Sequence, residues 1–131
     1  MASKKKPTLP RAGAAFAFPI GDGRYSVCRV ILDADSEASK RWGTEPMILI
    51  VTSAWVGDVI PRVEDPSLRP ILHLTHHNWS GKPNALWVSE EVPPDFIPIG
   101  AISPTPEEAD LPCLALGGWR GVTMQPLRQW R

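Results

Sequence analysis

The stretch 14-AAFAFPIGDGRYSVCRVIL-32 decides the fold of this chain. In its first half the large side chains Phe16, Phe18 and Ile20 alternate with two alanines and a proline. Alternate side chains of an extended chain lie on one face, so this pattern predicts a strand with one buried face. Gly21-Asp22-Gly23 follows, and these residue types tolerate the positive φ that a tight hairpin needs. With Arg24–Leu32 as the returning strand, the stretch predicts a β-hairpin that starts an all-β core.

The returning strand has apolar residues on both faces, so we expect both to be largely covered. Cys28 lies among these alternating core residues, where a thiol usually behaves as a small hydrophobic side chain. Arg24 and Arg29 interrupt the pattern. An arginine on a strand commonly lays its stem along apolar surface and keeps its charged head in water, and we expect this of both.

Size and composition indicate a single domain. The chain has 131 residues, of which 43% are hydrophobic and 21% are charged. These values are typical of one globular core. Residues 1–12 are basic and proline-containing with little to bury, so we expect a flexible tail before one β-rich domain at 13–131. Lys4, Lys5 and Lys6 leave open an arm that grips phosphates, but a solvated terminus is the favoured interpretation.

Charge and cysteine content narrow the class of protein. Fourteen Lys and Arg residues balance fourteen Asp and Glu residues, which gives no electrostatic reason to expect nucleic acid as a partner. Two cysteines, Cys28 and Cys113, do not make a disulfide framework. No apolar run reaches the roughly 20 residues of a membrane span, and none of signal-peptide length follows the basic start. We therefore expect a soluble cytoplasmic protein.

Fifteen prolines and ten glycines favour short strands over long helices. Residues 47–55 form the most apolar run and are predicted to be the central strand, covered on both faces. Pro98 places the segment 96–102 at an edge or a bulge. Further short strands are expected at 59–61, 71–75, 85–88 and 122–125, and residues 113–116 form the last apolar segment. Residues 33–45 and 103–112 are each expected to form a loop or a short helical turn, the second of these turns at 106–109. The predicted fold is mainly β, a small β-barrel or strongly bent antiparallel sheet, with the Src-homology-3 type as one candidate and short helices in loops.

Three sequence patterns resemble ligand-binding motifs but lack residues that the binding requires. The acidic run from Asp33 lacks the glycine and the bidentate glutamate that a calcium-binding loop needs at its sixth and twelfth positions. Ser80–Asn84 contains Gly-Lys but neither the upstream glycine nor the hydroxyl residue of a phosphate loop. His73, His76 and His77 lie close together without a nearby Cys, Asp or Glu to complete a metal site, so structural or partner-facing histidines are favoured. No metal or cofactor is expected.

Catalytic patterns are equally weak. The Gly-x-Ser-x-Gly turn of serine hydrolases is missing from the sequence. A cysteine hydrolase built on Cys28 or Cys113 with His73 stays open, because such pairs need only meet in space. The sequence therefore favours a protein that is not an enzyme.

Six tryptophans are the compositional peculiarity. We expect Trp87 and Trp119 to be mainly structural. Trp42, Trp55 and Trp79 have polar, flexible neighbours and are the better candidates for a binding surface.

The hairpin from Gly13 to Val30 resembles the start of the immunity protein 26 family. Members typically begin with a glycine, an aromatic-rich strand ending near proline, a Gly-Asp-Gly type turn, an aromatic residue and a strand closing on Arg-Val. The segment Phe96–Gly100, followed by a proline-rich acidic loop and Leu111-Pro112, is similar to the second half of that family. The likeness covers most of the chain, from about Gly13 to Trp119.

The resemblance implies a bacterial immunity protein, without a cofactor, that binds and neutralises the cognate toxin domain of a polymorphic toxin or contact-dependent system. On such a protein, loops on a rigid scaffold cover the toxin's active site. The predicted partner-binding residues are aromatic and histidine side chains together with carboxylates that would steer a basic toxin: Trp42, Trp55, His76, His77, Trp79, Glu90, Glu91, Asp95, Glu107 and Glu108. The alternatives are a small nucleic-acid-binding barrel that uses the basic tail and exposed aromatics, and the Cys/His hydrolase.

Overall fold

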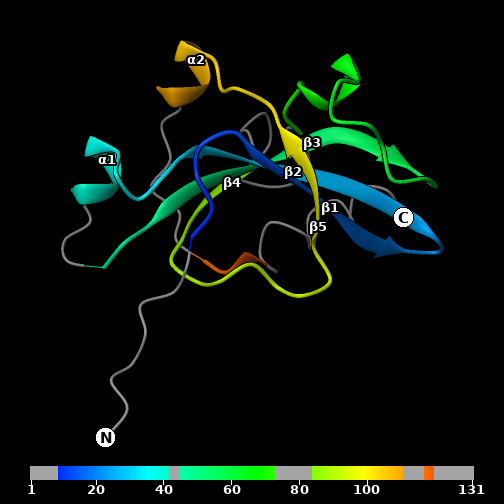
Figure 1. The fold of residues 1–131 in the computed structure, drawn as a ribbon, viewed down its shortest axis with the longest axis horizontal. Coiled ribbons are helices and arrows are strands. Elements are labelled where there is room, and N and C mark those ends of the chain that lie inside the picture. The colour runs from blue at the N-terminus through cyan, green and yellow to red at the C-terminus, as the bar shows by residue number, and fades with distance from the viewer. Residues whose placement is uncertain (1–8, 42–44, 73–83, 111–116, 120–131) are drawn as a thin grey trace, which may run out of the picture.

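The computed structural model describes residues 9–41, 45–72, 84–110 and 117–119. Within them, five strands form one antiparallel sheet in the order β4-β3-β2-β1-β5 (Figure 1). The strands are β1 (Ala14–Gly21), β2 (Arg24–Leu32), β3 (Ile48–Gly57), β4 (Ala85–Val88) and β5 (Ile97–Ala101).

The mainly β prediction is confirmed. Strands β4 and β5 are the two edges of the sheet and do not pair with each other in the described part of the chain. Of the two arrangements expected from the sequence, the structure therefore has the open antiparallel sheet and not the closed barrel.

The predicted hairpin is formed by β1 and β2, with Phe16 opposite Cys28 and Phe18 opposite Ser26. Its turn needs left-handed backbone: φ is +53° at Asp22 and +71° at Gly23. Glycine and aspartate adopt this region more easily than most residues. The Gly-Asp-Gly sequence therefore fixes where β1 ends and β2 begins.

The sheet has two different buried faces. The face that we call the aromatic face carries one large cluster, built around Phe16, Phe18, Phe96 and Trp119. Phe18 and Phe96 stack with ring centroids 5.2 Å apart, and Trp119 meets the ring of Phe96 edge-on at 5.6 Å. The opposite face, which we call the arginine face, carries two smaller clusters, one with Ala15, Ala17, Val27, Leu68 and Ile102 and one with Ile31, Leu49, Val51 and Trp87.

Short helical segments and loops cover these faces. Figure 1 shows α1 (Glu37–Lys40), the 3-10 turn η1 (Pro66–Leu68) and α2 (Pro106–Ala109) on one side of the sheet. This is the arginine face, because Ala38 and Leu68 pack into its two clusters. The connection from β4 to β5 runs over the aromatic face and buries Phe96 there. The predicted helical turns in the 33–45 loop and at 106–109 are confirmed.

Two strand predictions need correction. The apolar run at 47–55 is covered on both faces as expected, but β2 is the middle strand and β3 lies one place nearer the edge. Residues 59–61 form no strand: Val59 and Ile60 are exposed, with 69% and 40% of their surface accessible. Hydrophobic residues in this short stretch lie in the loop that leaves β3.

Other predictions are confirmed or fall outside the described residues. Residues 85–88 are β4, and Pro98 lies in the edge strand β5 next to an irregularity in its pairing with β1. Of the strand expected at 71–75, Ile71 forms a single bridge to Ser53. The apolar segment 113–116, the strand expected at 122–125 and most of the tail lie outside the described residues. Leu9, which we assigned to the tail, packs against the aromatic cluster.

Candidate functional site

The most unusual polar group in the described structure is Arg29, in the middle of the central strand β2. Its side chain is completely buried, with 0% exposure. It faces the arginine side of the sheet between Val27 and Ile31, and so separates the two apolar clusters there. The expectation that its charged head lies in water was therefore wrong. A buried guanidinium needs an anion and hydrogen-bond acceptors close by.

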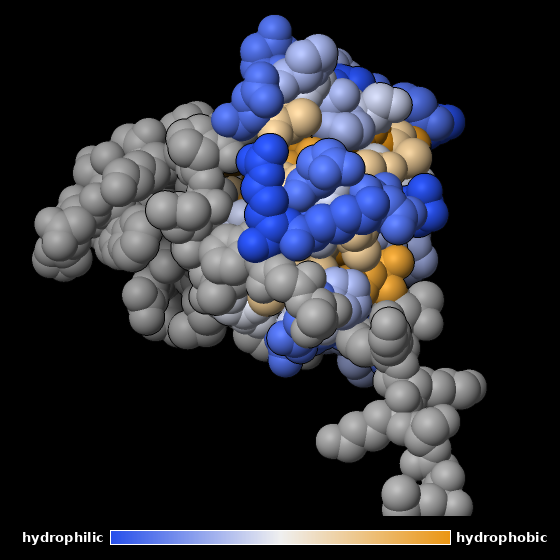
Figure 2. All heavy atoms as spheres, turned by 90° about the vertical axis from the view of Figure 1, so that its left-hand side faces the viewer, coloured by the Kyte–Doolittle hydropathy of each residue, from blue (hydrophilic) through white to orange (hydrophobic). Residues whose placement is uncertain are grey.

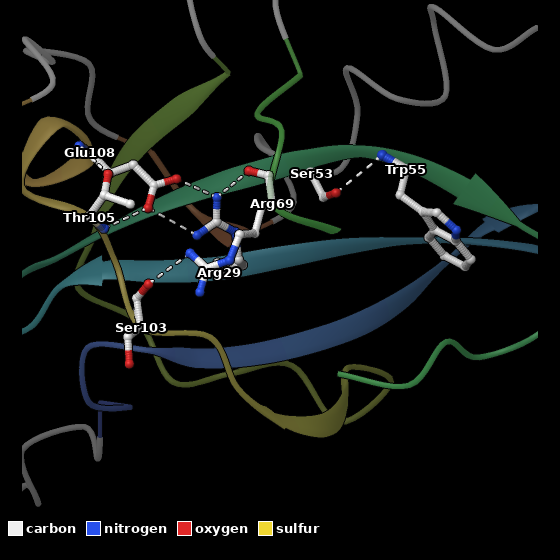
Figure 3. A network of polar contacts seen from close by, with 7 residues as sticks. All are labelled: Arg29, Ser53, Trp55, Arg69, Ser103, Thr105 and Glu108. Atoms are coloured by element: carbon white, nitrogen blue, oxygen red, sulfur yellow. Dashed lines mark hydrogen bonds and ion pairs between the residues drawn. The ribbon is translucent and has the colours of Figure 1, made fainter. Parts of the chain in front are cut away.

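Glu108 of α2 supplies the anion (Figure 3). Arg29 Nη2 donates to Glu108 Oε2 at 2.6 Å, and Nη1 donates to Oε1 at 3.2 Å, which makes a two-pronged pair. Nη2 also donates to the backbone oxygen of Arg69 at 2.6 Å. Only the Nε of Arg29 lacks a partner. The pair is charge-assisted and largely screened from water, since the Glu108 side chain is 14% exposed.

The sequence of α2 explains why Glu108 points at the sheet. Thr105 caps the helix: its hydroxyl accepts from the Glu108 N–H at 3.1 Å, while its own N–H donates to Glu108 Oε1 at 2.9 Å. This reciprocal capping box, with Pro106 in the first turn, is a helix-start signature that fixes the glutamate rotamer. The Glu108 carboxylate therefore accepts hydrogen bonds both from the start of α2 and from Arg29.

The electrostatics of Glu108 combine two opposing effects. Burial raises the pKa of its carboxyl, but the hydrogen bonds from Arg29 and Thr105 and the charges of Arg29 and Arg69 lower it. The net pKa lies below its ordinary value. Glu108 is therefore a carboxylate at neutral pH, paired with a permanently charged guanidinium, and this arrangement holds elements together without offering a group for acid-base chemistry.

Arg69 ties a third segment to this network. Its backbone oxygen accepts from Arg29, and its Nη1 donates to the Ser103 backbone oxygen at 3.2 Å. Asp65 caps η1 by accepting from the Ser67 N–H at 2.9 Å, which shapes the loop that presents Arg69. The network thus joins β2, the loop around η1 and the chain between β5 and α2.

Cys28 is the one candidate nucleophile among the described residues. It is 1% exposed in the aromatic cluster, and burial raises the pKa of its thiol well above the ordinary value. A thiol of this kind is a poor nucleophile at neutral pH. The prediction that Cys28 is a core hydrophobic residue is confirmed, while Cys113 and His73 lie outside the described residues.

Trp55, a predicted partner-binding residue, lies near the end of β3 on the arginine face, well away from Arg29 along the strand (Figure 3). Its ring lies over Gly57, where any side chain would collide with it. Its backbone oxygen accepts from the Ser26 hydroxyl at 3.1 Å. The ring is half-buried, so it is part of the core edge and also presents an aromatic surface. Trp87 and Trp119, predicted to be structural, are buried.

The predicted carboxylates do not form one surface. Glu90, Glu91 and Asp95 lie in the connection over the aromatic face, whereas Glu107 and Glu108 lie in α2 over the arginine face. Glu90 accepts a hydrogen bond from Trp119 Nε1 on its backbone oxygen at 2.9 Å, and its carboxylate lies against Gly118. Glu91 and Glu107 are exposed and Asp95 is half-buried. Because the Glu108 carboxylate is paired with Arg29, we assign Glu108 to the structural scaffold and not to a contact surface.

Four predicted partner-binding residues, Trp42, His76, His77 and Trp79, lie outside the described residues. For the last three, the structure places the flanking residues. Asn84 N donates to the Leu72 oxygen at 2.8 Å, so the two ends of the segment 73–83 lie beside each other. Thr52 of β3 holds both: its oxygen accepts from Leu72 N at 2.8 Å, and its hydroxyl accepts from Asn84 Nδ2 at 2.9 Å. The two flanking residues therefore meet at one buried point on β3.

Elsewhere the described surface carries both hydrophilic and hydrophobic residues. Figure 2 shows the end of the molecule that carries α1, where hydrophilic residues cover most of the described surface and leave small hydrophobic patches between them. The exposed large hydrophobic residues are Val59, Ile60 and Ile97. In the described ranges no group of three or more Cys, His, Asp or Glu side chains is placed to hold a metal ion. No helix in the same ranges is long and apolar enough to cross a membrane.

Sequence reasoning missed the importance of Arg29. The available signal was a charged residue in the middle of a strand whose neighbours on both faces are apolar. Its partner lies 79 positions further along the chain, and nothing in the local pattern identifies it.

Comparison of the chain with protein-family models, with curated proteins and with solved structures finds no match. The resemblance to the immunity protein 26 family therefore stays a prediction from the sequence.

Proposed function

We propose that this chain is an immunity protein, which binds the cognate toxin domain of a polymorphic toxin or contact-dependent system and neutralises it without catalysis. The observation that carries the proposal is the resemblance of the Gly13–Val30 hairpin to the start of the immunity protein 26 family. Such a protein requires a rigid scaffold with exposed loops. The five-stranded sheet, buried on both faces, supplies a scaffold of this kind.

The chemistry of the described residues supports binding over catalysis. The buried charge of Arg29 is neutralised internally by Glu108, and the thiol of Cys28 is enclosed in the core. The groups left for contact are the half-buried ring of Trp55, the exposed apolar side chains of Val59 and Ile60, and exposed carboxylates. Aromatic and exposed aliphatic side chains are common in the cores of protein–protein interfaces, and Val59 and Ile60 follow Trp55 closely in the sequence.

The exposed carboxylates Glu91 and Glu107 lie over opposite faces of the sheet, so they act on a partner at long range and not as one contact surface. Such charges speed the approach of a basic toxin domain without adding much to the final affinity. The proposal therefore assigns steering to these glutamates and the contact itself to Trp55, Val59 and Ile60 with the segment 73–83.

Co-expression tests the proposal in cells. If a large protein with a variable C-terminal domain is encoded immediately upstream, expression of that domain should arrest growth, and co-expression of this chain should restore it. Rescue by this chain and not by an unrelated immunity protein supports the proposal. Arrest that persists when this chain is present at equal or higher level would overturn it.

A second assay distinguishes the proposed immunity protein from the alternative, a nucleic-acid-binding protein. Filter binding of the purified chain to single-stranded and duplex nucleic acid should show no salt-sensitive complex, because the net charge is zero. A tight complex that weakens steeply with salt would favour this alternative instead.

A further inference from the structure

After the edge strand β5, residues 103–110 lie over the arginine face of the sheet. Ile102 follows the edge strand β5, donates its N–H to the Gly13 oxygen at 2.7 Å and is buried with Ala15 and Ala17. Within residues 103–110, Glu108 reaches Arg29 of the central strand β2.

Residues 103–110 are held against the described part of the fold by polar contacts. None of these residues belongs to any of the three buried apolar clusters, and α2 has no buried residue. Among the described residues, the polar contacts that join this segment to the rest of the fold are the Arg29–Glu108 pair and the hydrogen bond from Arg69 Nη1 to the Ser103 oxygen. The sheet beneath keeps its own apolar clusters whether or not this segment is in place.

We propose that residues 103–110 form a strap that opens from the sheet as a unit and is held closed by the charge of Glu108. When Glu108 is neutral, the Arg29 guanidinium lies between two apolar clusters without an anion, which is a costly state. Lifting the strap lets water reach the guanidinium, and this breaks far fewer interactions than unfolding the sheet does. The open form presents an unpaired cation at the centre of the arginine face. The inference is independent of the proposed toxin binding.

Neighbouring glutamates in α2 provide a matched test. In the Glu108→Gln variant the strap loses its charge pair, whereas in Glu107→Gln an exposed carboxylate with no role in the pair is removed. Backbone amides inside the strap report opening: Thr105, Glu108, Ala109 and Asp110 each donate to an acceptor within the strap, and a single helical turn that has left the sheet is too short to keep these hydrogen bonds.

Hydrogen exchange of the full chain at neutral pH should show these four amides exchanging at least tenfold faster in Glu108→Gln than in the wild type. The amides of β2 and β3 should exchange at wild-type rates, and Glu107→Gln should match the wild type throughout. Unchanged strap exchange in Glu108→Gln would overturn the proposal. Equal acceleration of strap and sheet, or equal effects of the two variants, would also overturn it.

Acid gives the same test without a substitution, and it applies even if Glu108→Gln does not fold. The charged groups that face Glu108 are Arg29 from β2 and Arg69 after η1. As the pH is lowered from about 6 to about 3, strap amides should lose protection before those of β2 and β3. Simultaneous loss of protection in strap and sheet would contradict a separable strap.

Discussion

At the scale of single residues, the two partners of the buried ion pair are not equivalent. Arg29 is fully buried between two apolar clusters, whereas Glu108 keeps 14% of its side chain exposed and also accepts from the Thr105 N–H. Removing Glu108 leaves a buried guanidinium without an anion. Removing Arg29 leaves a carboxylate that reaches water and keeps one hydrogen bond. The loss of stability should therefore depend on which partner of the pair is removed.

We expect Glu108→Gln to lower the free energy of unfolding by about 2–4 kcal/mol and Arg29→Met by only about 1–2 kcal/mol, because methionine fills the apolar space of the arginine stem. Urea unfolding followed by tryptophan fluorescence measures both values. Glu107→Gln is the control and should change stability by less than about 0.5 kcal/mol. Equal losses in Glu108→Gln and Arg29→Met would contradict the asymmetry.

The pair should also make stability depend on pH. The pKa of Glu108 is lowered in the folded protein from an ordinary value of 4.5, so the unfolded chain binds more protons between the two values. The stabilisation is therefore complete above the ordinary pKa and is lost as the pH falls through the folded one. The stability difference between wild type and Glu108→Gln should be constant from about pH 7 to about pH 5 and shrink in more acid solution. Urea unfolding at a series of pH values that gives the same difference at every pH would contradict this account.

At the scale of elements, the sequence predicted correctly those strands and turns that depend on residues close together in the chain. The alternation in β1, the Gly-Asp-Gly turn, the short strand β4 and the helical turn at 106–109 all depend on residues close in sequence, and the structure has each of them. The hydrophobicity of a strand indicates how deeply it is buried but not its position in the sheet. The apolar run at 47–55 therefore wrongly predicted β3 to be the middle strand. The role of Arg29 depends on Glu108 in a distant element, which no periodicity shows.

The edge strand β5 contains a backbone position that only glycine suits well. Gly100 has φ of +137°, and a Cβ there would lie 2.9 Å from Val63 Cγ1. Gly23 in the hairpin turn has φ of +71° and open space around it. We expect Gly100→Ala to destabilise the protein by about 2–4 kcal/mol and Gly23→Ala by about 1 kcal/mol, since the first combines backbone strain with a collision. Thermal and urea unfolding of the two variants compare them directly, and a cost at Gly100 no greater than that at Gly23 would show that Val63 yields without penalty.

At the scale of the whole molecule, the structure separates residues that the sequence grouped together. The predicted carboxylates lie on both sides of the sheet, and one of them, Glu108, belongs to the internal network. Trp55 lies instead near Val59 and Ile60 in the sequence, at the end of β3 and in the loop that leaves it. The contact surface that we propose combines this end of the sheet with the predicted residues His76, His77 and Trp79, for which only the flanking residues Leu72 and Asn84 are described, and these meet at Thr52.

The most direct test of the proposed function is a calorimetric titration of the full chain with the purified toxin domain encoded upstream, with the toxin's own activity measured on the same mixtures. The account predicts a 1:1 complex of nanomolar or tighter affinity, with activity falling in proportion to the toxin bound. Val59→Asp, at a side chain 69% exposed, should weaken binding at least about tenfold without changing stability, and Val59→Thr should weaken it less. No binding at micromolar concentrations, or binding that leaves the toxin fully active, would contradict the account.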